Sequence, residues 1–139
     1  MVIKMFISYS SEDIKFVKEI QLLVYTKFRD KIEPVISAQQ KAIGVDIPEK
    51  IVGHIEECEW FLVLLTYHSI SNPTVMHELG YAYGLFKAGK IRILPIVERI
   101  KDNAGKYVPI DVGIFFPKSI ESAEYIDEED KWDRCIKII

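Results

Sequence analysis

The chain has 139 residues, of which 49% are hydrophobic and 28% are charged. This length and composition fit one globular domain with its own core, and they exclude an intrinsically disordered chain. The formal net charge of -3 excludes a general attraction to nucleic acid or to an anionic membrane. We therefore expect a single domain over residues 1–139, with neither nucleic acid nor membrane as a partner.

The two cysteines, Cys58 and Cys135, are far apart and lack the paired spacing of a metal site or a disulfide framework. Two lone thiols suit a reducing compartment. The first residues show no cleavable signal pattern, and the longest apolar run, residues 60–65, is too short to span a bilayer. We expect a cytoplasmic protein without a bound metal.

Apolar runs alternate with amphipathic segments along the chain. The run at residues 2–9 predicts a buried strand, and Ser10 followed by Glu12 and Asp13 is typical of a helix start. Further strands are predicted at residues 32–37, 59–66, 91–97 and, more weakly, 108–116. Further helices are predicted from residues 46–48 to Cys58, at residues 74–88 and at residues 127–139.

Alternating strands and helices indicate an α/β domain with a mainly parallel sheet and helices on both faces. Such sheets bind ligands beyond the carboxyl ends of the strands, where the strand order reverses. If five strands follow the order 2-1-3-4-5, this point lies between the first and third strands, and the loops at residues 8–12 and 66–74 border it. Glu78, about one turn into the following helix, could reach the same crevice.

The apolar spacing of that helix places Val75, Leu79, Ala82 and Phe86 on its buried stripe. At about 100° per residue, Glu78 lies about 60° from the stripe. A carboxylate held there beside an apolar wall could stabilise the positive charge that develops on a sugar when an N-glycosidic bond breaks. A solvated surface glutamate is the alternative interpretation.

Other chemical motifs are incomplete. Residues 84–90 match part of a phosphate-binding loop, but Ile91 stands where a magnesium ligand should follow. Tyr81 replaces the second histidine of a zinc-binding HExxH pattern that would begin at His77. We therefore expect neither a phosphate loop nor a metal site.

Five segments, in order and at the usual spacing, resemble the TIR (Toll/interleukin-1 receptor) domain family, especially its prokaryotic branch. The likeness covers residues 1–97 well and the rest loosely. The matching segments are the first box at residues 6–13, the loop after the second strand at residues 42–48, the third strand at residues 60–66 with Ser69 in its turn, the segment of the catalytic glutamate at residues 78–82, and the fourth strand at residues 93–97.

This resemblance implies a flavodoxin-like, three-layer domain with the strand order 2-1-3-4-5. It also implies that Glu78 is catalytic, binds the nicotinamide-side ribose of NAD and supports cleavage of the nicotinamide bond. NAD is then the substrate, and no prosthetic group is implied. The nucleotide-binding residues would be Phe6, Ser8, Ser10, Ser37, Gly44, Ser69 and Thr74.

Two positions differ from the pattern of the enzymatic members. Thr74 stands where a tryptophan commonly precedes the catalytic glutamate by four residues, and Ser37 stands where an acid often follows the second strand. These differences concern the wall of the nicotinamide pocket and its lid. They favour low activity in isolation or an altered product.

Three functions stay open at this point. The first is an NAD nucleosidase or ADP-ribosyl cyclase in prokaryotic antiphage defence or signalling, which would assemble with other TIR domains and reach a separate effector protein through a nucleotide signal. The second is a non-catalytic adaptor that acts by TIR–TIR assembly through the loop at residues 39–48. The third is an enzyme like the nucleoside deoxyribosyltransferases, which have a related fold and also use a glutamate.

Overall fold

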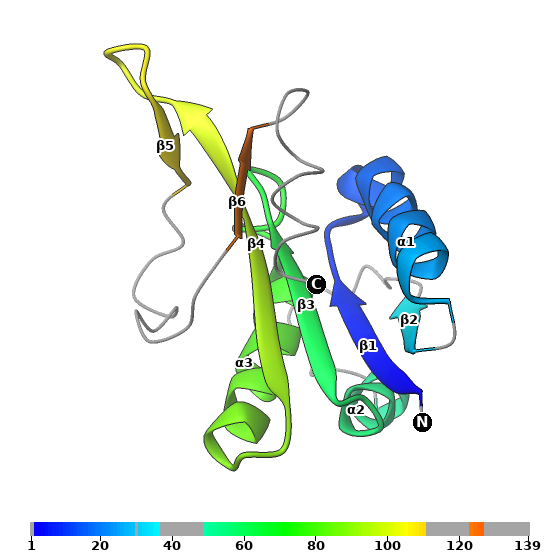
Figure 1. Ribbon diagram of the computed structural model, residues 1–139. Coiled ribbons are helices and arrows are strands. Elements are labelled where there is room, and N and C mark those ends of the chain that lie inside the picture. The colour runs from blue at the N-terminus through cyan, green and yellow to red at the C-terminus, as the bar shows by residue number, and fades with distance from the viewer. Residues whose placement is uncertain (1, 30, 37–48, 111–122, 127–139) are drawn as a thin grey trace.

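The computed structural model describes residues 2–29, 31–36, 49–110 and 123–126. Figure 1 shows a sheet flanked by helices. In chain order the elements are β1 (Ile3–Ser8), η1 (Ser11–Asp13), α1 (Ile14–Phe28), β2 (Ile32–Ile36), α2 (Glu49–Glu56), β3 (Trp60–Leu65), α3 (Pro73–Lys87), β4 (Arg92–Lys101), β5 (Tyr107–Pro109) and β6 (Ala123–Ile126).

The sheet has the order β2-β1-β3-β4, and its pairs along this path are parallel. Both β5 and β6 pair with β4, antiparallel and parallel respectively. The predicted α/β class and the strand order 2-1-3-4-5 are therefore confirmed. The parallel strand next to β4 is β6, however, which was not predicted from the sequence.

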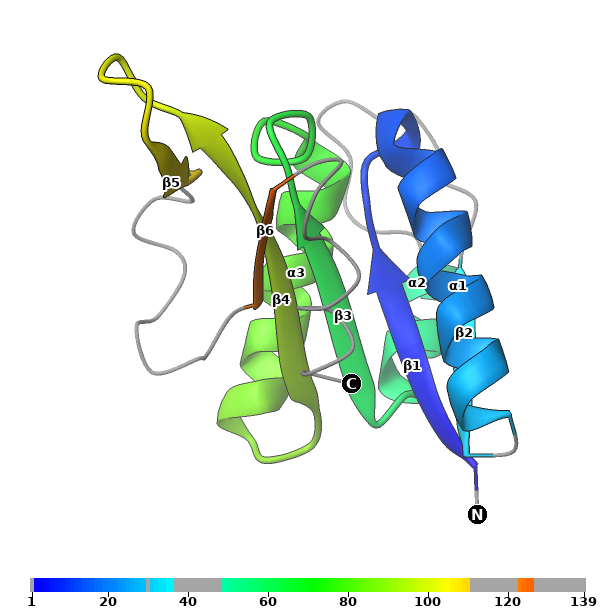
Figure 2. The same cartoon turned by 45° about the horizontal axis from the view of Figure 1, so that its top comes forward.

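The helices lie on both faces of the sheet (Figure 2), with α1 on one face and α2 and α3 on the other. Successive strand residues point to opposite faces, so each strand supplies both cores. Leu62 and Leu64 of β3 pack in the core under α1, whereas Phe61 and Val63 pack in the core under α2 and α3. The result is the expected three-layer domain.

The ends of α3 show why this helix forms where it does. The Asn72 side chain accepts hydrogen bonds from the backbone N–H groups of Thr74 and Val75, and Pro73 occupies the first turn. Gly89 follows the helix with φ +73°, a conformation that favours glycine. The observed helix thus begins and ends within one residue of the predicted range, residues 74–88.

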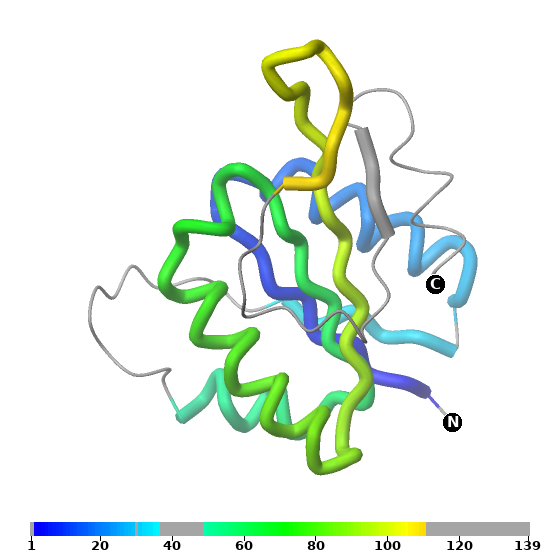
Figure 3. The backbone as a smooth tube through the Cα atoms, turned by 90° about the vertical axis from the view of Figure 1, so that its left-hand side faces the viewer, coloured from blue at the N-terminus to red at the C-terminus, as the bar shows by residue number. Residues whose placement is uncertain are grey.

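Strand β4 is longer than its neighbour. Its pairing with β3 ends at Val97, and its last residues pair with β5 instead. The turn of this hairpin is held by the Asp102 carboxylate, which accepts hydrogen bonds from two backbone N–H groups, and by Gly105 at φ +80°. The β4–β5 hairpin therefore projects beyond the carboxyl ends of β1 and β3 (Figure 3).

Several expectations fall on parts of the chain outside the described residues. These are the loop at residues 38–47, the last helix at residues 127–139 and most of the weak strand at residues 108–116. Within the described ranges, no helix is long and apolar enough to cross a bilayer.

The core under α1 can be tested with a matched pair of leucines. Leu64 is fully buried, whereas Leu22 on α1 is 66% exposed. We expect Leu64→Ala to lower the free energy of unfolding by about 2–5 kcal/mol, because it removes buried methyl groups and leaves a cavity. Leu22→Ala should change it by no more than about 0.5 kcal/mol. Urea unfolding of both variants checks this, and equal losses would contradict the assigned core.

Candidate functional site

The structure places Glu78 deep in the protein, on the second turn of α3. Its side chain is 1% exposed. Its carboxylate oxygen Oε1 accepts a hydrogen bond of 2.8 Å from the hydroxyl of Ser8, the last residue of β1. Since β2 and β3 lie on opposite sides of β1, this contact sits at the predicted reversal of the strand order. The alternative of a solvated surface glutamate is wrong.

Burial dominates the electrostatics of this carboxyl. Loss of solvation raises the pKa of Glu78 from 4.5 to about 7, although the hydrogen bond from Ser8 lowers it in part. The pKa of the neighbouring Tyr9 is also raised, first by burial and then by the charge of Glu78. Near neutral pH the Glu78 carboxyl is therefore divided between its protonated and ionised forms.

A second contact joins the loop after β1 to α3. Ser10 is 2% exposed, and its hydroxyl oxygen accepts a hydrogen bond of 3.4 Å from the Asn72 side-chain amide. Asn72 also caps α3, six residues before Glu78. The end of β1 and the loop after it are thus tied to α3 and its N-cap, through Ser8 and through Ser10.

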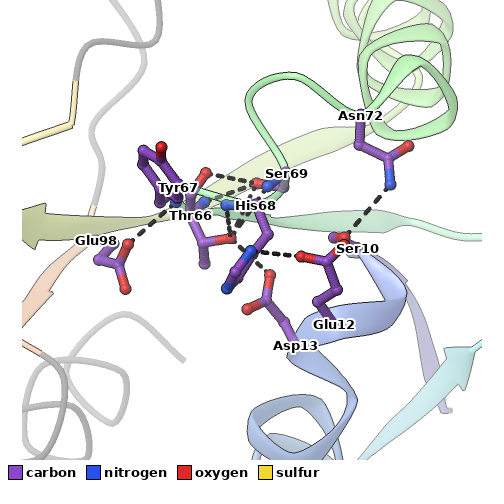
Figure 4. Close-up of polar contacts among 9 residues, drawn as sticks. All are labelled: Ser10, Glu12, Asp13, Thr66, Tyr67, His68, Ser69, Asn72 and Glu98. Carbon is purple, nitrogen blue, oxygen red and sulfur yellow. Dashed lines mark hydrogen bonds and ion pairs between the residues drawn. The ribbon is translucent and has the colours of Figure 1, made fainter.

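Two further contacts join this first loop to the loop after β3 (Figure 4). The Thr66 hydroxyl donates a hydrogen bond of 2.6 Å to the Asp13 carboxylate, and His68 Nδ1 lies 2.5 Å from Glu12 Oε2 in an ion pair. We call these four side chains, together with the bonded pair Ser10 and Asn72, the inter-loop clasp. The sequence had indicated Glu12 and Asp13 as a helix start and as part of the first TIR-like box, and it had predicted that the loops at residues 8–12 and 66–74 border one site. It had not predicted the individual contacts of Thr66, His68 or Asn72.

The loop after β3 is also stabilised by hydrogen bonds within the loop and by one hydrogen bond to β4. The Ser69 hydroxyl oxygen accepts a hydrogen bond of 2.6 Å from the Thr66 backbone N–H, and the backbone N–H of Tyr67 donates one of 3.1 Å to the Glu98 carboxylate. Ser69 is fully buried. This loop therefore has a defined shape before any ligand binds.

Two other predicted site residues, Phe6 and Thr74, make no contact with the Glu78 carboxyl among the contacts described above. Phe6 is fully buried and stacks on Phe61 with the ring centroids 5.6 Å apart, inside the core under α3. Thr74 lies one turn before Glu78, is half-buried, and donates its backbone N–H to Asn72. Ser37 and Gly44 lie outside the described residues, so their predicted roles stay predictions.

The cysteine in the described part of the chain is poorly suited to act as a nucleophile. Burial, followed by the charge of Glu59, raises the pKa of the Cys58 thiol to about 12, which disfavours the reactive thiolate. The described ranges contain no group of three or more histidine, cysteine, aspartate or glutamate side chains placed to hold a metal ion. Glu78 is thus the buried ionisable group around which a site can be built.

Comparison with known proteins identifies the family of this chain. A family model described as a TIR domain matches residues 5–137. The chain belongs to the TIR domain family. This match confirms the resemblance found in the sequence. A comparison with curated proteins found no match.

Solved structures show the same fold for this TIR domain. A prokaryotic SEFIR domain has 22% sequence identity and a TM-score of 0.57, over 96% of this chain and 87% of its own. The TIR domains of the activated Roq1 resistosome, which directly recognizes the pathogen effector XopQ, have 16% identity and a TM-score of 0.56 over 73% of this chain. This TIR domain spans 60% of that Roq1 chain. At these identities the likeness shows the fold alone.

The raised pKa of Glu78 makes stability depend on pH. Below pH 4.5 the carboxyl is protonated in both the folded and the unfolded chain. Between pH 4.5 and about 7 the unfolded chain releases a proton that the folded chain keeps, so the free energy of unfolding should fall by about 3 kcal/mol as the pH rises. Glu78→Gln lacks this titration, and its stability relative to the wild type should rise over the same window. Urea unfolding across this range measures the difference, and parallel curves would rule out the raised pKa.

Ser8→Ala tests the other contribution to the pKa of Glu78, the hydrogen bond from Ser8. It removes the hydrogen bond that lowers the pKa of Glu78. The pKa should therefore rise above that of the wild type, and the loss of stability should extend to higher pH. Carboxyl ¹³C NMR titration of Glu78 in both proteins checks the direction, and a lower value in Ser8→Ala would contradict the contact.

Proposed function

We propose that this TIR domain cleaves the bond between nicotinamide and ribose in NAD, with Glu78 as the catalytic carboxylate. The observation that carries the proposal is the position of Glu78. Its buried carboxyl lies between β1 and α3 at the carboxyl ends of the strands, where sheets of this kind bind ligands. Membership of the TIR family adds support, because the matched range, residues 5–137, includes the segment at residues 78–82 that resembles the family's catalytic segment.

The proposed reaction needs negative charge beside a sugar. The bond from ribose C1′ to the nicotinamide nitrogen breaks, and its electron pair leaves with nicotinamide, which becomes neutral. Positive charge then develops on C1′ and the ring oxygen. Water adds to C1′ and releases a proton, which gives ADP-ribose, or a nucleophile of the same nucleotide adds and gives a cyclic isomer. A carboxylate shielded from water stabilises this charge more strongly than one in bulk solvent.

The ionised form of Glu78 carries out this role. A pKa of about 7 leaves a substantial fraction ionised at neutral pH. The positive charge of the nicotinamide ring would favour the ionised form further, because a nearby opposite charge lowers the pKa of a carboxyl. Burial thus lowers the ionised fraction of the Glu78 carboxyl in the free protein, and the bound substrate would raise this fraction again.

The proposed setting rests on the family resemblance. Copies of the TIR domain would assemble side by side in the cytoplasm, and NAD cleavage would serve prokaryotic antiphage defence or signalling. The product would either deplete NAD or act as a nucleotide signal for a separate effector protein. Assembly would matter most if the isolated domain has low activity, as Thr74 in place of the usual tryptophan favours.

One observation favours a second function, assembly without catalysis. Glu78 is 1% exposed and already accepts a hydrogen bond from Ser8. In this case the contact would only fasten α3 to β1, and the domain would act as an adaptor. The two functions differ in whether a substrate ever replaces Ser8 at the carboxyl.

The direct test incubates concentrated protein with NAD and resolves the products by mass spectrometry. We expect nicotinamide release, and Glu78→Gln should lower it by about 10²–10³-fold, the usual cost of one preorganised electrostatic contact. Glu57→Gln, at an exposed glutamate outside the site, should leave the rate unchanged. No release at any concentration, including conditions that promote assembly, would favour the adaptor. Base exchange on deoxynucleosides would instead favour the deoxyribosyltransferase-like reaction.

The pH dependence of kcat/KM gives an independent test, since it reports ionisation in the free enzyme. The ionised carboxylate is the active form, so kcat/KM should rise with pH and level off above about pH 7. Ser8→Ala should move the inflection to higher pH. An inflection that stays in place in this variant would exclude Glu78 as the titrating group.

A further inference from the structure

Two polar contacts join β1 and the loop after it to α3. The Ser8 hydroxyl donates to the Glu78 carboxylate at 2.8 Å. The Asn72 side-chain amide donates to the Ser10 hydroxyl at 3.4 Å, and Figure 4 shows the amide directed at Ser10. Alternate residues of an extended chain point to the same face, and the backbone of Ser10 is extended. Ser8 and Ser10 therefore both face α3.

The spacing of the two contacts fits a strand and a helix that run in opposite directions. Asn72 precedes Glu78 by six residues, which is about 9 Å along a helix axis. Ser8 precedes Ser10 by two residues, which is about 7 Å along a strand. The earlier residue of each segment bonds the later residue of the other. A single contact would let α3 turn about it, whereas two contacts at different heights also restrain the direction of the helix.

Asn72 is bonded through both ends of its side chain. Its side-chain oxygen accepts hydrogen bonds from the backbone N–H groups of Thr74 and Val75, at 2.9 and 3.3 Å. Its side-chain nitrogen donates to Ser10, and its backbone N–H donates to the Ser69 carbonyl at 3.0 Å. A serine could cap the helix equally well, but it has no amide with which to reach the first loop. Asparagine thus links three segments at once.

Burial gives the bond between Asn72 and Ser10 weight in spite of its length. Ser10 is 2% exposed and Asn72 is half-buried. A buried hydroxyl that loses its partner keeps the cost of its lost hydration. A shift of the start of α3 away from β1 would therefore be opposed at Ser10 as well as at Ser8.

We propose that Asn72 is a positioning residue for Glu78, which holds the start of α3 against the loop after β1 so that the carboxyl stays on the Ser8 hydroxyl. The positioning stands on the contacts alone, whereas its effect on catalysis rests on the proposed NAD cleavage. Asn72 acts through the helix and not on the substrate. Misplacement of a reacting group by about 1 Å can cost up to about 10²-fold in rate, so such a residue affects the reaction from outside the site.

Two variants remove the bond from opposite ends and leave the cap of α3 in place. Asn72→Ser keeps a good N-cap oxygen but lacks the amide donor. Ser10→Ala removes the acceptor, and the Ser10 side chain makes no cap bond to the turn that follows it. Both variants should therefore fold.

The readout is the rise in the pKa of Glu78 that Ser8→Ala causes, measured by carboxyl ¹³C NMR titration. This rise reports how closely Ser8 meets the carboxyl, so it should fall by about half or more when Asn72→Ser or Ser10→Ala is also present. Tyr9, the titratable neighbour of Glu78, stays protonated in this range because burial raises its pKa above 10.0. A Ser8→Ala effect of full size in both variants would overturn the proposal.

Tyr81→Phe is the matched control on the same helix. It removes a hydrogen bond that joins α3 to Glu56 of α2 and not to β1. The effect of Ser8→Ala on the pKa of Glu78 should keep its wild-type size in this variant. A reduction equal to that in Asn72→Ser would mean that any loosening of α3 has the same effect, and would overturn a specific role for Asn72.

Steady-state kinetics test the catalytic consequence. Asn72→Ser should lower kcat for nicotinamide release by about 10–100-fold and change KM by less than about twofold, because Asn72 acts on the position of Glu78. A loss confined to KM would indicate contact with the substrate and overturn the positioning role. If no protein releases nicotinamide but the Ser8→Ala effect falls as expected, the proposed function fails while the positioning of Glu78 is supported.

Discussion

The hydrogen bond from Ser8 to Glu78 is the contact on which the arrangement of this domain depends. It joins residues 70 positions apart in the chain, at the end of β1 and inside α3. A buried carboxyl without a partner is costly, so this bond favours the position of α3 against the sheet, together with the apolar packing of Val75, Leu79 and Ala82. The same contact also acts on the chemistry, because it opposes in part the effect of burial, which is the main cause of the raised pKa of Glu78.

Much of this fold could be predicted from the sequence, because apolar runs and helix caps are local signals. The strands at residues 3–8 and 60–65 and the helix that contains Glu78 followed from such patterns. Strand β6 did not, since its four residues, Ala123–Ile126, are too few and too mixed for a periodic pattern, and the strand forms by pairing with β4. Helix phase put Glu78 on the flank of α3, whereas its burial depends on tertiary packing, which includes the contact with Ser8 of β1.

The clasp shows why the rest of the site escaped prediction. Glu12 and Asp13 have a sufficient local explanation as the acidic start of a helix. The sequence predicted that the loops at residues 8–12 and 66–74 lie near one site, but it did not indicate which side chains pair. His68 likewise belongs to an ordinary turn. Contacts between side chains on separate loops depend on strand order and loop shape, which periodicity does not encode.

The margins of the sheet have a consequence for how copies of this domain can meet. Among the described strands, β5 has three residues and β6 has four, and both lie beside β4. At the opposite margin, β2 carries Pro34, which has no backbone donor. Short strands and proline are the usual protection against edge-to-edge aggregation. Continuous strand addition is thus discouraged, which leaves helices and loops as the surfaces on which a second domain can dock.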